Sequence, residues 1–361
     1  METIEDLRGF LADMTREGIR GQLLDRGTAR AIMRQARELP ADAPPFGITI
    51  ETDLAEYGFS VLRAGLALRE AGEHSELSQR AFERAANAFE SLVRNASPEA
   101  VERGFYRTIA GVAYHLAGFS AIAYSLFGQH IAGLNVTPAE DALILLILRD
   151  LEALREHTRT WLRDEANGDQ TLVALLEADE IDADDALAVI LNSNVCRALA
   201  YFDFALQTGE AELLDAAKAL LAGGIRLAAD AGAVSLWWIT RLCLNMIDDL
   251  WAHSLHVNLP TEPPAGGAEN YSELRRMFLA SLYARRNAEV ELWPSQFEAA
   301  GRSSDLSDDL VVALPTSAGK TRIAEMAALM TLSVEKRVLI VTPLRALSAQ
   351  TERSFRRTFG P

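Results

Sequence analysis

Three consecutive residues near the carboxyl end, Gly319-Lys320-Thr321, have the groups needed to bind a triphosphate and its metal ion. Gly319 allows backbone N–H groups to approach phosphate oxygens closely, and Lys320 can reach the β- and γ-phosphates. The hydroxyl of Thr321 is a suitable ligand for Mg²⁺. Together with the preceding Leu314-Pro315-Thr316-Ser317-Ala318, these residues predict a phosphate-binding loop.

Such a loop must join a strand to a helix, and both flanks have suitable patterns. Leu310-Val311-Val312-Ala313 is a short apolar run typical of a buried strand. After the loop, apolar residues recur at helical spacing: Ile323, Met326, Ala327 and Met330. The general pattern Gly-x-x-x-x-Gly-Lys-Ser/Thr is met only in part, because Leu314 stands at the first glycine. A chance Gly-Lys-Thr at the start of a surface helix therefore remains the alternative for the tripeptide alone.

Two further stretches flank the loop in a particular order. Upstream lies Leu292-Trp293-Pro294-Ser295-Gln296-Phe297-Glu298-Ala299, and downstream lies Val338-Leu339-Ile340-Val341-Thr342-Pro343-Leu344-Arg345-Ala346-Leu347. The three stretches together resemble the start of superfamily 2 DEAD/DEAH-box helicases, and their residues look most like those of the Ski-like branch. In that family a glutamine lies a little over twenty residues before the loop lysine, and a small apolar residue commonly replaces the first glycine. The resemblance covers only about the last 70 residues of this sequence.

The resemblance implies specific roles for the matched residues, with ATP and Mg²⁺ as cofactors. Gln296 would read the adenine edge, and Lys320 and Thr321 would serve catalysis, Thr321 as the Mg²⁺ ligand. The nucleotide-binding set is Gln296, Thr316, Ser317, Ala318, Gly319, Lys320 and Thr321. Pro343 and Arg345 match the motif that lines the nucleic-acid track, where arginine and backbone N–H groups hold phosphates without reading bases.

Several parts of a complete motor are not found in these 361 residues. The family also uses an Asp-Glu pair that organises Mg²⁺ and water, a second RecA-like domain, and arginines that stabilise the transferred phosphoryl group. We therefore expect the sequence to be the amino-terminal portion of a longer protein. Alone, it is expected to have no significant ATPase activity.

Composition indicates a packed globular protein in a reducing compartment. Hydrophobic residues make up 49% of the sequence, and the two cysteines, Cys196 and Cys243, each lie among apolar neighbours. The amino terminus lacks the basic and apolar regions of a secretory signal. The longest apolar run, Ala142 to Leu148, is far shorter than the roughly 20 residues needed to cross a bilayer. We expect a cytoplasmic protein without membrane contact.

The net charge of −16 is concentrated in the first part of the chain. Residues 286–361 hold 10 basic and 9 acidic residues, which leaves 25 basic and 42 acidic residues in 1–285. Because 259–285 is balanced at 3 of each, the excess of 17 negative charges belongs to residues 1–258. Nucleic acid, DNA rather than RNA, is expected to bind the carboxyl-terminal part, since phosphate binding needs Lys and Arg. The acidic part is expected to bind a protein partner.

The overall pattern predicts a mainly α protein whose first domain, residues 1–258, is all helical. Apolar stripes run through residues 53–71 and 76–94, and Thr137-Pro138-Ala139-Glu140 has the spacing of a capping box. Small residues facing aromatic residues in 80–127 and 198–244 resemble tetratricopeptide-type repeats, although no strict period is present. An irregular all-helical domain is the alternative.

A Pro/Gly-rich linker at 259–269 is predicted to separate this domain from an incomplete RecA-like domain 1 at 270–361. That second domain would begin with a helix from about Tyr271 to Arg286. It would continue as strand 310–314, helix 320–332, strand 338–341 and helix 347–355, which is the start of a parallel α/β sheet. Asp249, His253 and His256 share a helix face, but a zinc site is disfavoured because no further Cys or His follows at ligand spacing.

Three functions fit these features. The first is an ATP-dependent nucleic-acid helicase or translocase with a helical accessory domain. The second is a protein-interaction module of a bacterial genome-surveillance or antiviral complex, in which the helicase acts with a nuclease. The third is a regulatory P-loop ATPase that does not act on nucleic acid. The stretch Pro343-Leu344-Arg345-Ala346-Leu347 favours the first over the third, because a plain ATPase has no need of it.

Overall fold

The computed structural model describes residues 3–16, 18–40, 42, 47–96, 100–128, 135–164, 167–168, 183–264, 267, 270–293, 296–314 and 319–360. The chain forms two compact units. Unit 1 comprises residues 1–200 and 216–246, and unit 2 comprises residues 201–215 and 247–361. The predicted linker at 259–269 therefore lies within unit 2.

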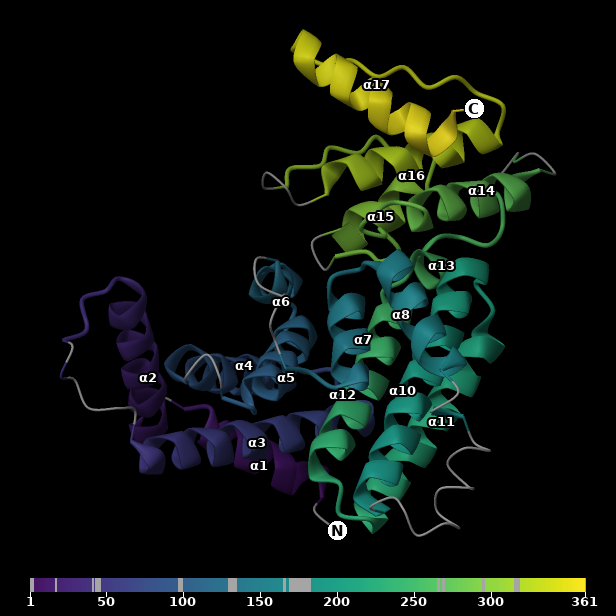
Figure 1. Ribbon diagram of the computed structural model, residues 1–361. Coiled ribbons are helices and arrows are strands. Elements are labelled where there is room, and N and C mark those ends of the chain that lie inside the picture. Colours follow the sequence, from purple (N-terminus) through teal and green to yellow (C-terminus); the bar gives the residue numbers. More distant parts are fainter. Residues whose placement is uncertain are drawn as a thin grey trace. The chain divides into compact units, whose positions relative to one another are not determined.

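Unit 1 consists of helices, as the sequence predicts (Figure 1). Its helices are α1 (Ile4–Met14), α2 (Ile19–Gln35), α3 (Ile48–Glu70), α4 (Glu76–Asn95), α5 (Arg103–Leu116), α6 (Ser120–Phe127), α7 (Pro138–Ile147) and α8 (Leu151–Arg163), with most of α10 (Ala183–Thr208), α11 (Ala211–Asp230) and α12 (Val234–Ala252). Among the described residues, no helix combines the length and the apolar content that crossing a membrane requires.

The centre of unit 1 is the packing of α3 on α4. Phe82 and Phe89 of α4 are fully buried against glycines of α3. A Cβ at Gly58 would lie 2.9 Å from the Phe89 ring, and one at Gly65 would lie 3.0 Å from Phe82. The two helices approach closely because these positions have no side chain.

Local sequence signals also set the start of α7. Thr137 is the N-cap, its hydroxyl accepts from the backbone N–H of Glu140, and the Glu140 carboxylate accepts from the backbone N–H of Thr137. Pro138 occupies the first helical turn, where a missing N–H costs nothing. The predicted capping box is confirmed.

Cys196 and Cys243 are both buried and free, as predicted.

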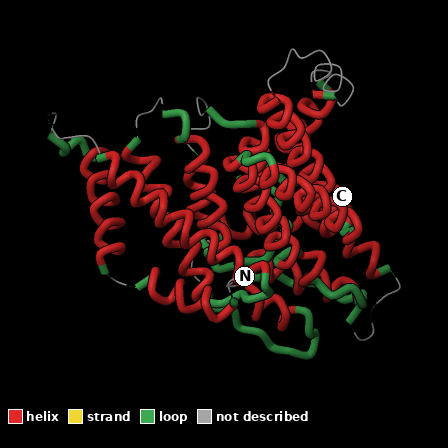
Figure 2. The backbone as a smooth tube through the Cα atoms, turned by 90° about the horizontal axis from the view of Figure 1, so that it is seen from below, coloured by secondary structure: helices red, strands yellow, loops and turns green. Residues whose placement is uncertain are grey.

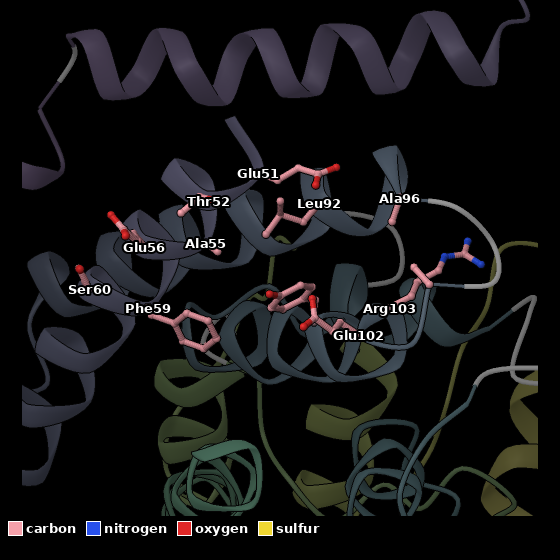
Figure 3. Close-up of a pocket in the computed structure, with 12 residues that line it drawn as sticks. Glu51, Thr52, Ala55, Glu56, Phe59, Ser60, Leu92, Ala96, Glu102 and Arg103 are labelled. Carbon is pink, nitrogen blue, oxygen red and sulfur yellow. The ribbon is translucent and has the colours of Figure 1, made fainter. Parts of the chain in front are cut away.

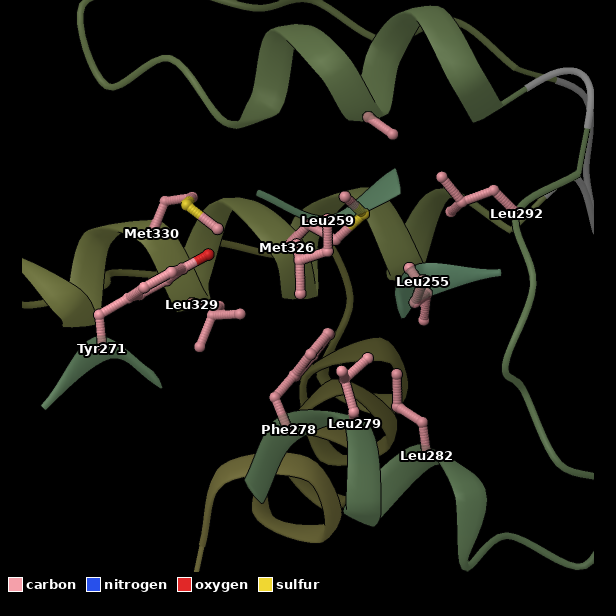
Figure 4. Close-up of a cluster of buried hydrophobic side chains, with 11 residues drawn as sticks. Leu255, Leu259, Tyr271, Phe278, Leu279, Leu282, Leu292, Met326, Leu329 and Met330 are labelled. Carbon is pink, nitrogen blue, oxygen red and sulfur yellow. The ribbon is translucent and has the colours of Figure 1, made fainter. Parts of the chain in front are cut away.

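Unit 2 is built from shorter helices around one apolar cluster. These are α13 (Leu255–Asn258), α14 (Tyr271–Tyr283), α15 (Phe297–Ser303), α16 (Lys320–Ser333) and α17 (Arg345–Phe359). Figure 4 shows side chains of α13, α14 and α16 converging in this cluster, among them Leu255, Phe278, Met326 and Met330. Of the apolar residues predicted to share a face of the helix after the loop, Ile323, Met326 and Met330 are buried and Ala327 is partly buried.

The mainly helical class is confirmed, but the two strands expected in unit 2 are not formed. Figure 2 shows helices and loops, and the one β-bridge in the described part of the chain pairs Ser254 with Glu291. Residues 310–314 and 338–341 belong to neither helix nor strand. Val311, Leu339 and Val341 are 92%, 87% and 83% exposed. A strand needs a paired neighbour, and the described residues place none beside these runs.

Candidate nucleotide-binding site

The best-defined part of the candidate site is the start of α16. Gly319 is its N-cap and has φ 74° and ψ 30°, in the left-handed region that glycine adopts without penalty. A Cβ at this position would lie 1.9 Å from Nε2 of Gln296. The backbone angle therefore favours glycine here, and a side chain would displace the Gln296 amide. No side chain caps this helix end, so the helix dipole faces the loop and favours negative charge there.

Gln296 joins the first predicted motif to the loop. Its side chain is 4% exposed. Its Nε2 donates to the carbonyl of Gly319 at 3.1 Å, across 23 residues of sequence, and its Oε1 accepts from the backbone N–H of Trp293 at 2.8 Å. The predicted contact with an adenine edge would require these hydrogen bonds to be exchanged, and that role stays a prediction.

Lys320 and Thr321 both lie at the surface in the first turn of α16. The Lys320 ammonium donates to the carbonyl of Leu314 at 2.7 Å, so it bridges the two described ends of the loop. Thr316, Ser317 and Ala318, which were predicted to wrap the phosphates, lie outside the described residues. The geometry suits a phosphate, because an accessible ammonium lies at the positive end of a helix of 14 residues.

The predicted nucleic-acid residues lie at the start of α17. Pro343 and Arg345 are exposed, and Arg345 is the first residue of the helix. Farther along α17, Arg353 is also exposed, whereas Arg356 pairs with Glu352 of the same helix at 2.8 Å. The position leaves Arg345 accessible to a phosphate.

A largely buried ionic network that was not predicted from the sequence lies along α16. Arg322 is 5% exposed and Glu325 is fully buried. Nη1 of Arg322 donates to Oε2 of Glu325 at 2.6 Å, and its Nη2 pairs with Glu289. Arg285 donates to Glu289 at 2.8 Å and to Glu325 at 3.2 Å. Four charges, two of each sign, therefore neutralise one another beside α16.

Two hydroxyls extend this network to α17. The Thr358 hydroxyl donates to Oε1 of Glu325 at 2.9 Å and accepts from Arg285 at 2.8 Å. The hydroxyl of Ser354 donates to the same Glu325 oxygen at 3.2 Å. Burial lowers the pKa of Arg322, and Glu325 and Glu289 oppose that shift. The helix that begins with Lys320 is thus tied to the helix that begins with Arg345.

One sequence signal could have indicated the network. Arg322 and Glu325 stand three residues apart, next to the buried positions Ile323 and Met326. An arginine and a glutamate at this spacing, beside buried apolar residues, are expected to form an ion pair because neither charge can be buried alone at low cost. Its other partners, Arg285 and Glu289, could not be inferred from spacing.

Asp249, His253 and His256, the residues considered for a zinc site, make other contacts within the chain. His253 contacts Asp249 at 3.1 Å, whereas Nε2 of His256 donates to the carbonyl of Leu206 at 2.7 Å. Burial lowers the pKa of His256, which favours the neutral imidazole. Each group thus has a partner within the chain.

Parts of the chain are similar to known proteins. Residues 294–361 match the family described as DEAD/DEAH box helicase. The chain is 21% identical over 338 residues to Hachiman protein HamB of Bacillus cereus, covering 93% of this chain and 28% of that protein. Over 51 residues it is 55% identical to DExH-box ATP-dependent RNA helicase DExH15, chloroplastic, of Arabidopsis thaliana, covering 14% of this chain and 4% of that protein. The chain thus spans less than a third of either relative.

Proposed function

We propose that this chain is the amino-terminal part of an ATP-dependent nucleic-acid helicase or translocase of the Ski-like branch, acting in the cytoplasm. The observation that carries the proposal is the contact of Gln296 with Gly319, which joins two motifs of the family match. An unrelated Gly-Lys-Thr at a surface helix would have no reason to be tied to a glutamine 23 residues earlier.

The described residues supply distinct parts of such a motor. The start of α16 and Lys320 would hold the ATP phosphates, and the Thr321 hydroxyl would bind the accompanying Mg²⁺. Thr316, Ser317 and Ala318 would complete the loop, and Gln296 would select adenine. Bound Mg²⁺ would neutralise phosphate charge during hydrolysis. Pro343 and Arg345 would contact the nucleic-acid backbone, with DNA as the preferred substrate.

The acidic residues 1–258 are proposed as the part that docks a protein partner, ahead of the motor part at 270–361. Their excess of 17 negative charges repels nucleic acid and favours basic surfaces. This part is also included in the similarity to HamB, which covers 93% of the chain. That coverage favours a second candidate function, a module of a bacterial antiviral complex in which the helicase acts with a nuclease.

The proposal is tested by ATP hydrolysis in the longer protein that carries this chain. Single-stranded or duplex DNA should stimulate hydrolysis more than RNA of the same sequence. Arg345→Ala should weaken this stimulation about tenfold or more, because the phosphate contact is lost. Arg226→Ala, an exposed arginine of unit 1, is the matched control and should leave stimulation unchanged. Hydrolysis that no nucleic acid stimulates would favour the regulatory P-loop ATPase instead.

A further inference from the structure

Unit 1 contains a cavity between α3, the end of α4 and the start of α5, which is here called the α3–α5 pocket. Its volume is ≈ 740 Å³. Its walls combine carboxylates with aromatic and aliphatic side chains: Glu51, Glu56, Phe59, Leu92, Glu102 and Tyr106 (Figure 3). A volume in this range suits a ligand of several groups rather than a single ion.

The charge of the α3–α5 pocket is negative. Glu51, Glu56 and Glu102 line it, and Arg103 is the basic residue among its described lining residues. Figure 3 shows the Arg103 guanidinium extended away from Phe59. Two of the carboxylates, those of Glu56 and Glu102, belong to exposed residues. A cationic ligand is therefore favoured over a phosphate, which these carboxylates would repel.

The aromatic side chains of the pocket indicate which kind of cation it would bind. Phe59 and Tyr106 are only partly buried, and their ring centroids lie 6.3 Å apart. Phe89 packs at 4.8 Å from Phe59 and 5.7 Å from Tyr106, and Trp238 packs at 5.0 Å from Phe59. Burial, followed by the charge of Glu102, raises the pKa of Tyr106 to about 12, so its phenol stays neutral. Neutral rings beside carboxylates suit a guanidinium, which stacks on aromatic faces and pairs with carboxylates through two N–H groups.

We propose that the α3–α5 pocket binds a short protein segment centred on an arginine. The guanidinium would lie against Phe59 and Tyr106 at the pocket wall and pair with Glu102, and Glu56 would add to the negative charge of the pocket. Apolar neighbours of that arginine would contact Leu92, since one arginine side chain cannot fill the cavity. The inference rests on the docking role proposed for residues 1–258 and names its site. It is independent of nucleotide chemistry, because the pocket lies wholly in unit 1.

The test uses the full 361-residue chain and the peptide acetyl-Ala-Leu-Arg-Leu-Ala-amide, with binding measured by calorimetry at low ionic strength. A second peptide carries citrulline, the neutral isostere of arginine, in the central position. The arginine peptide should bind about tenfold or more tightly than the citrulline peptide, because charge pairing and the cation–π contact are lost. Added salt should weaken the binding of the arginine peptide.

Two variants locate the binding. The double substitution Glu56→Gln with Glu102→Gln should weaken binding of the arginine peptide about tenfold, and Glu212→Gln, an exposed carboxylate of α11, should leave it unchanged. Circular dichroism confirms that each variant is folded. Absence of binding, equal affinity for both peptides, or equal effects of the two variants would overturn the inference. None of these outcomes would alter nucleic-acid-stimulated hydrolysis, which tests the motor separately.

Discussion

Different interactions hold the helices together in the two units. In unit 1, α3 and α4 are joined by apolar contacts in which glycines receive the rings of Phe82 and Phe89. In unit 2, α16 and α17 are joined through a buried carboxylate, Glu325, that binds two arginines and two hydroxyls. Apolar packing depends on shape over a whole helix face, whereas an ionic network depends on every member being present. Removing one charged group of this network should therefore destabilise the helices of unit 2, much as removing one buried ring destabilises those of unit 1.

The largest effect is expected from Phe89→Ala in unit 1. The ring contacts Phe59 and Tyr106 and fills the space beside Gly58, so its removal leaves a cavity. Stability should fall by about 3–5 kcal/mol. Urea denaturation measures the loss, and hydrogen exchange should locate it in α3, α4 and α5. Phe119→Ala, at a residue 40% exposed, is the control and should cost little. Equal costs for the two substitutions would argue against the packing described for unit 1.

A loss of about 2–3 kcal/mol is expected from Glu325→Gln in unit 2, because Arg322 and Arg285 would lose the buried one of the two carboxylates that pair with both of them. Hydrogen exchange should quicken in α16 and α17 and stay unchanged in α3 and α4. The control is Glu352→Gln, since Glu352 pairs with Arg356 at the surface of α17 and should contribute about 0.5 kcal/mol or less. If both variants are equally stable, the network does not hold these helices together.

The contrast between the units matches what sequence could and could not predict. The helices of unit 1 follow from local patterns, such as the apolar stripe of α4 and the capping box at Thr137. The ties of unit 2 join distant residues: Gln296 to Gly319 across 23 positions and Arg322 to Glu289 across 33. Contacts between residues so far apart produce no repeating pattern in the sequence. The strands expected at 310–314 and 338–341 failed for a related reason, because their patterns are local but pairing requires a neighbour.

A smaller, local effect is expected from Gly319→Ala. The left-handed backbone costs a residue with a side chain about 1–2 kcal/mol, and the new methyl group would displace the Gln296 amide. The loss of stability should be confined to unit 2. Gly301→Ala on α15 is the control, because a Cβ there meets no atom within 4 Å. A Gly319→Ala variant as stable as Gly301→Ala would show that the contact with Gln296 is unimportant.

A pH-dependent effect concerns the contact of His157 with Asp141 in unit 1. Hydrogen bonds to Asp141 and then to Cys196 raise the pKa of His157 to about 10. Since the folded pKa lies above the unfolded value of about 6.5, this stabilisation is complete below about pH 6.5 and is lost as the pH rises towards 10. His157→Gln should therefore lower the urea midpoint at about pH 6 more than at about pH 9. A difference independent of pH would exclude the charged pair.

The central claim, that residues 294–361 supply the nucleotide site of a motor, is tested most directly at Lys320. ATP hydrolysis is measured with single-stranded DNA in the longer protein that carries this chain, for the parent, Lys320→Ala and Lys336→Ala. Lys336 is exposed three residues beyond α16 and serves as the matched lysine control. The account predicts that Lys320→Ala abolishes DNA-stimulated hydrolysis while Lys336→Ala keeps it. Hydrolysis unchanged by Lys320→Ala would contradict the assignment of this site.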